Sequence, residues 1–287
     1  LMIGAEPPQL EHRPFEPREV LLDVQQLTRP KPDEYGMALE QISFSVRSGE
    51  ILGIAGVSGN GQAELLAALS GEASRAGNGS LSLLGVDITR ASAARRRKLG
   101  LHFVPEERLG RATVPSHSLS SNALLTRRAA LPRSWLLQNK PLYRLAQHVI
   151  ERFSVKASGP RAAARSLSGG NLQKYVVGRE IDAAPRVLLV AQPTWGVDVG
   201  AAAQIRAELL RLRDAGSAVL LVSEELDELF ELSDTLRVIA GGRLSPPIAT
   251  AQANRSQIGE WMSGLWPGNS AQLDARDGPR DAAGAPS

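Results

Sequence analysis

The feature that most constrains the fold of this chain is a glycine-rich loop between an apolar run and a helical stretch. The apolar run Ile51–Ala55 precedes the loop, and Ala63–Leu69 has the composition of a helix. The loop consists of Gly56, Val57, Ser58, Gly59, Asn60, Gly61, Gln62 and Ala63. Glycines at this spacing let successive backbone N–H groups turn inward and hold phosphate oxygens at a helix start. A strand, a glycine loop and a helix in this order predict an α/β fold with a phosphate-binding loop.

The side chains that complete such a loop are missing. In the motif G-x-x-x-x-G-K-S/T, the lysine reaches the β- and γ-phosphates and the hydroxyl binds Mg²⁺. Gln62 and Ala63 stand at those two positions. A neutral amide brings no positive charge, and alanine has no oxygen for a metal. The loop alone leaves two interpretations open, a phosphate cradle of backbone groups and a tight strand-to-helix turn without a ligand.

The rest of the chain alternates short apolar runs with helical stretches, which predicts a mainly parallel sheet with helices on both faces. The apolar runs predicted as strands are Val20–Leu27, Ile42–Val46, Gly100–Val104, Val187–Val190, Val219–Val222 and Thr235–Ile239. The predicted helices are Asn171–Ile181 and Ala201–Ala215, with a broken helical region at 116–160. No apolar run approaches the length of about 18 residues that a membrane-spanning helix needs.

Composition excludes several classes of function. The 33 Lys and Arg against 30 Asp and Glu give a net charge of +3, a field too weak to favour nucleic acid. The chain has no cysteine, which excludes disulfides, thiolate metal sites and cysteine nucleophiles. Its four histidines lie far apart in the sequence and lack the spacing of metal ligands.

Three further segments resemble the motifs of ATP-binding cassette (ABC) proteins. The first resembles the LSGGQ signature in its LSGGNxQK form, with Leu167, Ser168, Gly169, Gly170, Asn171 and Gln173. The second runs from Val187–Val190 through Ala191 and Gln192 to Asp198, where ABC cassettes carry the Walker B strand, the catalytic glutamate and the D-loop. The third places Glu224 at the switch histidine. Order and spacing of all four segments match an ABC cassette.

This resemblance covers roughly residues 20–265 and is closest to the second cassette of fused two-cassette ATPases that drive sugar and nucleoside importers. Val104–Arg108 (VPEER) resembles the V-P-E-D/E-R stretch that this family has at its Q-loop, where most ABC proteins have Gln and this chain has Glu106. Leu1–Gly4 (LMIG) resembles the end of a first cassette. The stretches AQPTWGVDVG and EELDELFELSD are most similar to the nucleoside branch.

The resemblance implies an α/β P-loop ABC nucleotide-binding domain with an antiparallel β subdomain and a helical subdomain. We expect residues 1–18 to be a linker from a preceding cassette and residues 19–266 to be the domain. The helical subdomain would span about 116–182, and 267–287 would be a disordered tail. Helices in 116–160 and the segment Glu106–Arg111 would form the groove for a coupling helix of a membrane subunit.

The resemblance also implies that this chain's own site is degenerate. The catalytic positions carry residues that differ from the pattern of most ABC proteins, namely Gln62, Ala63, Glu106, Ala191, Gln192 and Glu224. The signature and Asp198 remain. ABC cassettes pair head to tail, so this signature would complete the site of the first cassette of the same polypeptide or of a second copy. ATP and Mg²⁺ would be held there, and no metal in the site of this chain.

The predicted function is therefore that of a degenerate C-terminal cassette of an ATP-driven importer for nucleosides or simple sugars. Its partners would be integral membrane permease subunits at the cytoplasmic face of the inner membrane, with no nucleic acid. Three alternatives stay open: a catalytically competent ABC ATPase of the same fold, a soluble ABC protein outside transport, and a pseudo-cassette kept as scaffold. The solute stays open as well, because a cassette does not touch it.

Two lesser features each have a functional and a structural interpretation. Tyr35 precedes the second predicted strand, near where cassettes stack an aromatic ring on adenine, and is equally interpreted as an ordinary loop tyrosine. The basic run Arg95–Lys98 could attract nucleic acid, but a short run on a helix favours a solvated face. The sequence gives no role for Trp195.

Overall fold

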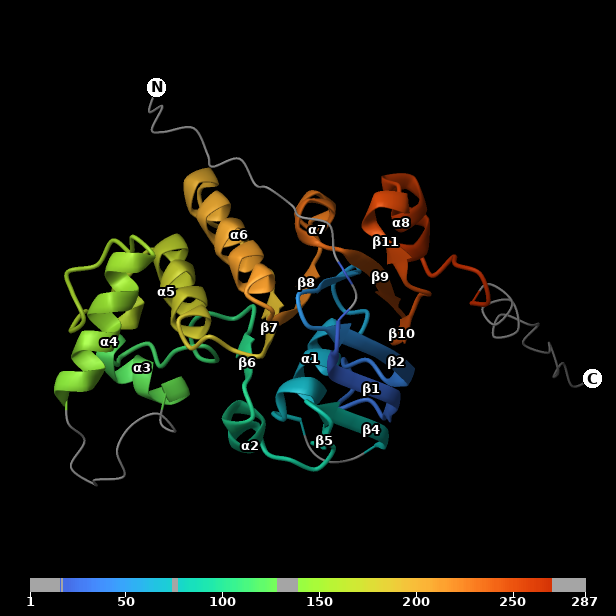
Figure 1. Ribbon diagram of the computed structural model, residues 1–287, viewed down its shortest axis with the longest axis horizontal. Coiled ribbons are helices and arrows are strands. Elements are labelled where there is room, and N and C mark those ends of the chain that lie inside the picture. The colour runs from blue at the N-terminus through green and yellow to red at the C-terminus, as the bar shows by residue number, and fades with distance from the viewer. Residues whose placement is uncertain (1–15, 17, 74–76, 128–138, 270–287) are drawn as a thin grey trace, which may run out of the picture.

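The computed structural model of the chain describes residues 16, 18–73, 77–127 and 139–269 (Figure 1). The Leu1–Gly4 segment lies outside these residues, as do nearly all of the predicted linker and tail. The middle of the predicted helical region, 128–138, lies outside them too. Domain boundaries at 18 and 266 therefore stay predictions.

A seven-stranded sheet contains the apolar runs that follow the glycine loop in the sequence. Its strand order is β10-β9-β3-β8-β7-β6, and β11 also pairs with β9. The parallel strands are β3 (Ile51–Ala55), β6 (Leu101–Val104), β7 (Val187–Ala191), β8 (Ala218–Ser223) and β9 (Thr235–Ala240). The short strands β10 (Arg243–Leu244) and β11 (Ile248–Ala249) pair antiparallel with β9. The prediction of a mainly parallel sheet is confirmed.

A second, four-stranded sheet is antiparallel, with the order β2-β1-β4-β5. Its strands are β1 (Val20–Arg29), β2 (Leu39–Arg47), β4 (Asn78–Leu83) and β5 (Val86–Asp87). Leu22 and Val24 of β1 are fully buried, so this sheet buries one face and exposes the other. It is the antiparallel β element that the resemblance implies.

Eight α-helices connect or cover the strands in the described part of the chain. They are α1 (Gln62–Ser70), α2 (Ala93–Lys98), α3 (Leu119–Arg127), α4 (Asn139–Arg152), α5 (Gly169–Ile181), α6 (Val199–Asp214), α7 (Leu226–Leu232) and α8 (Arg255–Met262). Helices α3, α4 and α5 lie together on one side of the molecule, and α8 lies on the other (Figure 1). The first group is the helical element expected within 116–182.

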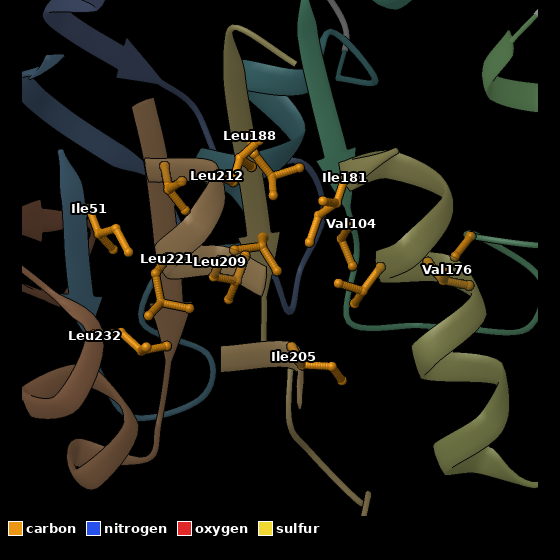
Figure 2. Close-up of a cluster of buried hydrophobic side chains, with 14 of the residues drawn as sticks. Ile51, Val104, Val176, Ile181, Leu188, Ile205, Leu209, Leu212, Leu221 and Leu232 are labelled. Atoms are coloured by element: carbon orange, nitrogen blue, oxygen red, sulfur yellow. The ribbon is translucent and has the colours of Figure 1, made fainter. Parts of the chain in front are cut away.

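The core has two parts because successive residues of a strand point to opposite faces of the sheet. On one face, Ile51, Leu188 and Leu221 pack with side chains of α5, α6 and α7 (Figure 2). On the other face, Leu189 and Leu220 pack against α1 and the antiparallel sheet. The expectation of helices on both faces is right, because α1 lies on the second face, but helices without a sheet cover only the first. The antiparallel sheet covers much of the other, because its strands also carry a buried apolar face.

The basic run 95–98 is exposed at Arg95 and Lys98, as the sequence favoured, but Arg96 turns inward. Arg96 is 4% exposed, and its Nη1 donates to the carbonyl oxygens of Ala68 and Leu69 at 2.6 and 2.7 Å. Its Nε donates to the carbonyl of Ala91 at 3.1 Å. Burial, with a smaller contribution from Arg29, lowers the pKa of Arg96 to about 10. A cation is favourable at this place because the last carbonyls of α1 carry no intrahelical partner.

Candidate functional site

The glycine loop joins β3 to α1 in the way its sequence predicts. Gly61, the residue before α1, has a φ of +111°, a left-handed conformation that glycine adopts without strain. A Cβ atom on Gly56 would lie 2.6 Å from Nε2 of Gln62 and 2.7 Å from the carbonyl oxygen of Ile239. These glycines therefore allow a close approach between the loop, the start of α1 and strand β9.

Gln62 folds its side chain back into the loop. Its Nε2 donates to the carbonyl oxygen of Val57 at 2.9 Å, and its Oε1 accepts from the backbone N–H of Asn60 at 3.0 Å. That N–H belongs to the backbone groups that the motif would offer to phosphate. The neutral Gln62 side chain thus occupies one of the N–H groups that were predicted to bind phosphate.

Asn60 fixes the loop to the turn between β9 and β10. Its Oδ1 accepts from the N–H of Gly241 at 2.9 Å, and its carbonyl accepts from the N–H of Gly242 at 3.0 Å. Its Nδ2 donates to the carbonyl of Val57 at 2.8 Å. The carbonyl of Val57 therefore receives both side-chain amides, and the loop is held closed by its own polar groups.

The positions that the sequence predicted as degenerate catalytic ones meet at the loop, as parallel-strand topology requires. They surround a cavity of about 70 Å³, which we call the loop cavity and which lies at the carboxyl ends of β3, β6, β7 and β8. Its lining includes the predicted residues Gly56, Ser58, Gly59, Gln62, Ala63, Glu106, Ala191, Gln192 and Glu224. Small-molecule sites usually measure about 300–1,000 Å³, so this space is small for a nucleotide.

Gln192 directs its side chain toward the end of β8. It is 8% exposed, and its Oε1 accepts from the backbone N–H of Glu224 at 3.2 Å. The hydroxyl of Ser223 lies 3.3 Å from the same oxygen. An amide at this position holds two strand ends together and has no basicity with which to activate water.

The residues around the loop cavity do not fit Mg²⁺ with ATP. Ala63 and Ala191 offer no oxygen ligand, and Glu106 and Glu224 bring negative charge to the cavity. The cation that lines it, Arg111, is paired with Glu72 at 2.6 Å. In the described part of the chain, no group of three or more His, Asp or Glu side chains could hold a metal ion.

Glu228 is a buried carboxyl group beside this site that the sequence did not reveal. It is 1% exposed, and it accepts from the hydroxyls of Thr194 at 2.6 Å and Ser223 at 2.9 Å. Burial raises the pKa of Glu228 although both hydrogen bonds favour the charged form. Glu228 thus ties α7 to Thr194, which follows β7, and to Ser223, the last residue of β8. No sequence pattern distinguishes it from the neighbouring acidic residues Glu225 and Asp227.

The signature residues lie at the first turn of α5. Ser168 is the exposed N-cap residue, and its hydroxyl accepts from Nδ2 of Asn171 at 2.9 Å. The helix begins at Gly169, two residues before its predicted start. A helix N-terminus presents free N–H groups and the positive end of the helix dipole, which favour anions. Leu167 to Gln173 do not line the loop cavity.

Behind the signature, Gln173 and Arg108 join three segments. Gln173 is 1% exposed, and its Nε2 donates to the carbonyl of Pro193 at 2.9 Å. Its Oε1 accepts from Nε of Arg108 at 2.9 Å, and Arg108 also donates to the carbonyl of Trp195. Burial lowers the pKa of Arg108. The sequence placed Arg108 within a motif but gave its side chain no role.

Asp198 and Tyr35 have simple local surroundings. Asp198 is the N-cap of α6, and its Oδ1 accepts from the N–H of Ala201 at 2.9 Å. It lies between Trp195 and Val199, which are 59% and 81% exposed. Tyr35 is 94% exposed and does not line the loop cavity, so an adenine contact stays a prediction.

Comparison with known proteins identifies the family. The family model described as ABC transporter matches residues 39–195, from β2 to the segment after β7. The chain belongs to the ABC transporter family. Within the described residues of this ABC cassette, no helix is both long and apolar enough to cross a membrane.

Curated relatives of this ABC cassette include import proteins. The guanosine import ATP-binding protein NupO of Bacillus subtilis is 36% identical over 92% of the chain and 52% of its own length. The nucleoside import ATP-binding protein NupA of Lactococcus lactis is 35% identical over 87% of the chain and 49% of its own length. The chain thus spans about half the length of the curated relatives it matches.

Solved structures confirm the ABC ATPase fold. An ATP-binding subunit of an ABC transporter aligns with a TM-score of 0.66 and 18% identity over 89% of this chain and 98% of that one. The cassette MJ0796, bound to ADP and Pi, aligns with a TM-score of 0.69 and 16% identity over 80% and 99%. The predicted α/β fold with antiparallel β and helical elements is confirmed.

Proposed function

We propose that this chain is the degenerate second cassette of an ATP-driven ABC importer for nucleosides or simple sugars. Its signature would complete the ATP site whose phosphate loop belongs to the first cassette. Relatives named for guanosine, nucleoside and ribose import support the solute class. The match to about half of each relative supports the two-cassette arrangement.

The observation that carries the proposal is the side chain of Gln62 bonded into its own loop. ABC ATPase domains bind ATP with Mg²⁺, and hydrolysis needs a cation and a metal at the β- and γ-phosphates. This chain has Gln62, Ala63 and Ala191 where those groups would act. A hydrogen bond to a charged group contributes about 1.5–3 kcal/mol, and about 1.4 kcal/mol is tenfold in rate. Loss of several such groups supports an inactive site.

The signature end of α5 supports the other half of the proposal. Ser168 is exposed, and Gly169 and Gly170 form the first turn of the helix. Phosphate of ATP held by the other cassette would meet this turn when the two cassettes pair head to tail. Mg²⁺ would belong to that site, and the chain contributes a hydroxyl, backbone N–H groups and the helix dipole.

The remaining parts of the proposal concern the partner subunits and the location of the cassette at the membrane. Integral membrane permease subunits would contact the helical side formed by α3, α4 and α5 together with Glu106–Arg111. The cassette would then be peripheral at the cytoplasmic face of the cell membrane, with residues 1–18 as a linker from the first cassette. The net charge of +3 gives no support to a nucleic acid partner.

Two measurements test the proposal. The chain alone should release phosphate from Mg-ATP no faster than a blank without protein. In the complete two-cassette transporter, Ser168→Arg should abolish ATP hydrolysis and solute uptake, because the larger side chain blocks closure on the first turn of α5. Gln62→Ala should change both rates by less than about twofold, because its two hydrogen bonds lie within its own loop and away from the ATP site of the first cassette.

Ser263→Arg is the matched control, because Ser263 is an exposed residue at the end of α8. Steady turnover by the lone chain would support a competent ATPase and refute the degenerate site. A transporter that tolerates Ser168→Arg would refute the shared site. Co-purification with ribosomes or DNA rather than with membrane subunits would support a soluble ABC protein.

A further inference from the structure

Three segments of the chain meet at the side chain of Arg108. The first is the segment after β6 that contains Arg108, the second is the first turn of α5, and the third is Pro193–Gly196 after β7. Arg108 donates through Nε to Gln173 at 2.9 Å and through Nη2 to the carbonyl of Trp195. A Cβ on Gly169 would lie 2.9 Å from Nη1 of Arg108, so the guanidinium packs directly on the signature.

The hydrogen bonds around Arg108 link its side chain and its backbone to neighbouring segments. Gln173 accepts from Arg108 with one end of its amide and donates to the carbonyl of Pro193 with the other. The carbonyl of Arg108 itself accepts from the hydroxyl of Thr113, a residue that is 1% exposed. Both the backbone and the side chain of Arg108 are therefore held, and they fix two segments at once.

We infer that Arg108 is a positioning residue that sets the place of Ser168 relative to the segments 105–111 and 193–198. This inference rests on the proposed function, in which Ser168 and its helix turn complete the ATP site of the other cassette. Catalytic geometry tolerates little displacement, and an error of about 1 Å can cost about 100-fold in rate. A shift of the 105–111 segment would move the signature through Arg108 and Gln173.

Arginine suits this role better than lysine. The planar guanidinium offers donors in fixed directions, so one side chain reaches Gln173 and the carbonyl of Trp195 together. A lysine keeps the positive charge, but its single ammonium group does not offer donors in two fixed directions. Gly169 leaves the room that the guanidinium occupies. Arg108→Lys should therefore keep the fold and the charge, which Arg108→Gln loses, but should position Ser168 only in part.

The first experiment measures hydrogen–deuterium exchange of the chain with Arg108→Gln and Arg108→Lys. The hydrogen-bonded backbone amides of Leu172, Trp195 and Val197 should exchange about tenfold faster in Arg108→Gln, with a smaller increase in Arg108→Lys. Amides of β8 and α8 should keep their rates. The control is Arg165→Gln, because Arg165 is exposed and lies three residues before the signature serine.

The second experiment measures ATP hydrolysis by the complete transporter. Arg108→Gln should lower kcat about 10- to 100-fold and change KM for ATP by less than about threefold, because the loop that binds ATP lies in the other cassette. Gln173→Leu should lower kcat similarly. The double variant should be no worse than the poorer single variant, since both residues act through one contact.

The outcomes separate the inference from the proposed function. If Ser168→Arg abolishes hydrolysis while Arg108→Gln alters neither kcat nor exchange, the inference is wrong and the proposed function stands. If Ser168→Arg is harmless, the proposed function falls, and the exchange rates still judge the contact set. An effect of Arg108→Gln on KM alone, or uniformly faster exchange across the whole chain, would show a structural role and overturn the inference.

Discussion

Removing the side chain of Gln62 should make this cassette bind triphosphate better, which is the reverse of what loss of a loop side chain usually does. The side chain makes two hydrogen bonds inside the loop, at 2.9 and 3.0 Å. Neutral hydrogen bonds contribute about 0.5–1.5 kcal/mol each, and Gln62 is half-buried. We therefore assign about 1–2 kcal/mol to the closed loop. An incoming phosphate must break these bonds before it reaches the N–H of Asn60.

Gln62→Ala removes that cost. At about 1.4 kcal/mol for each factor of ten, the affinity for tripolyphosphate or ATP should rise between about 5-fold and 30-fold. Isothermal titration of the chain at fixed ionic strength measures the affinity directly. The free energy of unfolding in urea should fall by about 1–2 kcal/mol over the same substitution, because the loop loses the same bonds.

The matched control is Gln257→Ala, another glutamine in the first turn of a helix, α8. It should alter neither affinity nor stability by a measurable amount. An unchanged or lower affinity in Gln62→Ala, with the expected loss of stability, would show that the amide does not compete with phosphate. The explanation of the closed loop would then be wrong.

Three further predictions follow from other contacts. Gln192→Glu should leave the chain without ATP turnover in a phosphate-release assay, because it restores neither the missing lysine nor a metal ligand. Arg96→Met should lower the free energy of unfolding in urea by about 2–4 kcal/mol, since two buried carbonyls and one part-buried carbonyl lose their donor. Substitution of the exposed Arg95 by Met should change it by less than about 0.5 kcal/mol. Burial raises the pKa of Glu228 above its ordinary 4.5, so the folded chain keeps a proton that the unfolded chain has already released. The free energy of unfolding of the wild-type chain should therefore fall as pH rises from 4.5 through the folded pKa of Glu228, because the proton that stabilises the folded state is lost. In Glu228→Gln, which cannot titrate, urea unfolding should show a smaller fall of the free energy of unfolding over the same pH range.

The strands of the parallel sheet could be predicted within one or two residues because each is buried on both faces. Such a strand is a continuous apolar run bounded by polar residues, as in β7 and β8. Strand β4 was not predictable in this way. Its first three residues, Asn78–Ser80, are exposed, and it forms because β1 supplies a hydrogen-bonding partner from a distant part of the sequence.

The site was predictable as a set of positions but not as a set of contacts. Parallel strands bring their carboxyl ends to one edge, so motif spacing alone places Gln62, Gln192 and Glu224 around one cavity. The direction of a side chain depends on what the fold offers it. Gln62 bonds backward to Val57, and Arg108 crosses from one segment to two others; neither contact leaves a trace in residue spacing.

The glycine loop and the signature turn of this cassette differ in what their polar groups bind. At the glycine loop, Gln62 accepts from the N–H of Asn60, so a group suited to phosphate already has a partner within the chain. At the signature, Ser168 is exposed; its hydroxyl oxygen accepts from Asn171, so the hydroxyl hydrogen is what it would donate to a phosphate. A polar group that already has a partner gains little from a ligand, because each new hydrogen bond replaces an existing one. Under the proposed function we therefore expect this chain to contribute to one composite ATP site, and a transporter built with it to hydrolyse ATP at one site in each cassette pair.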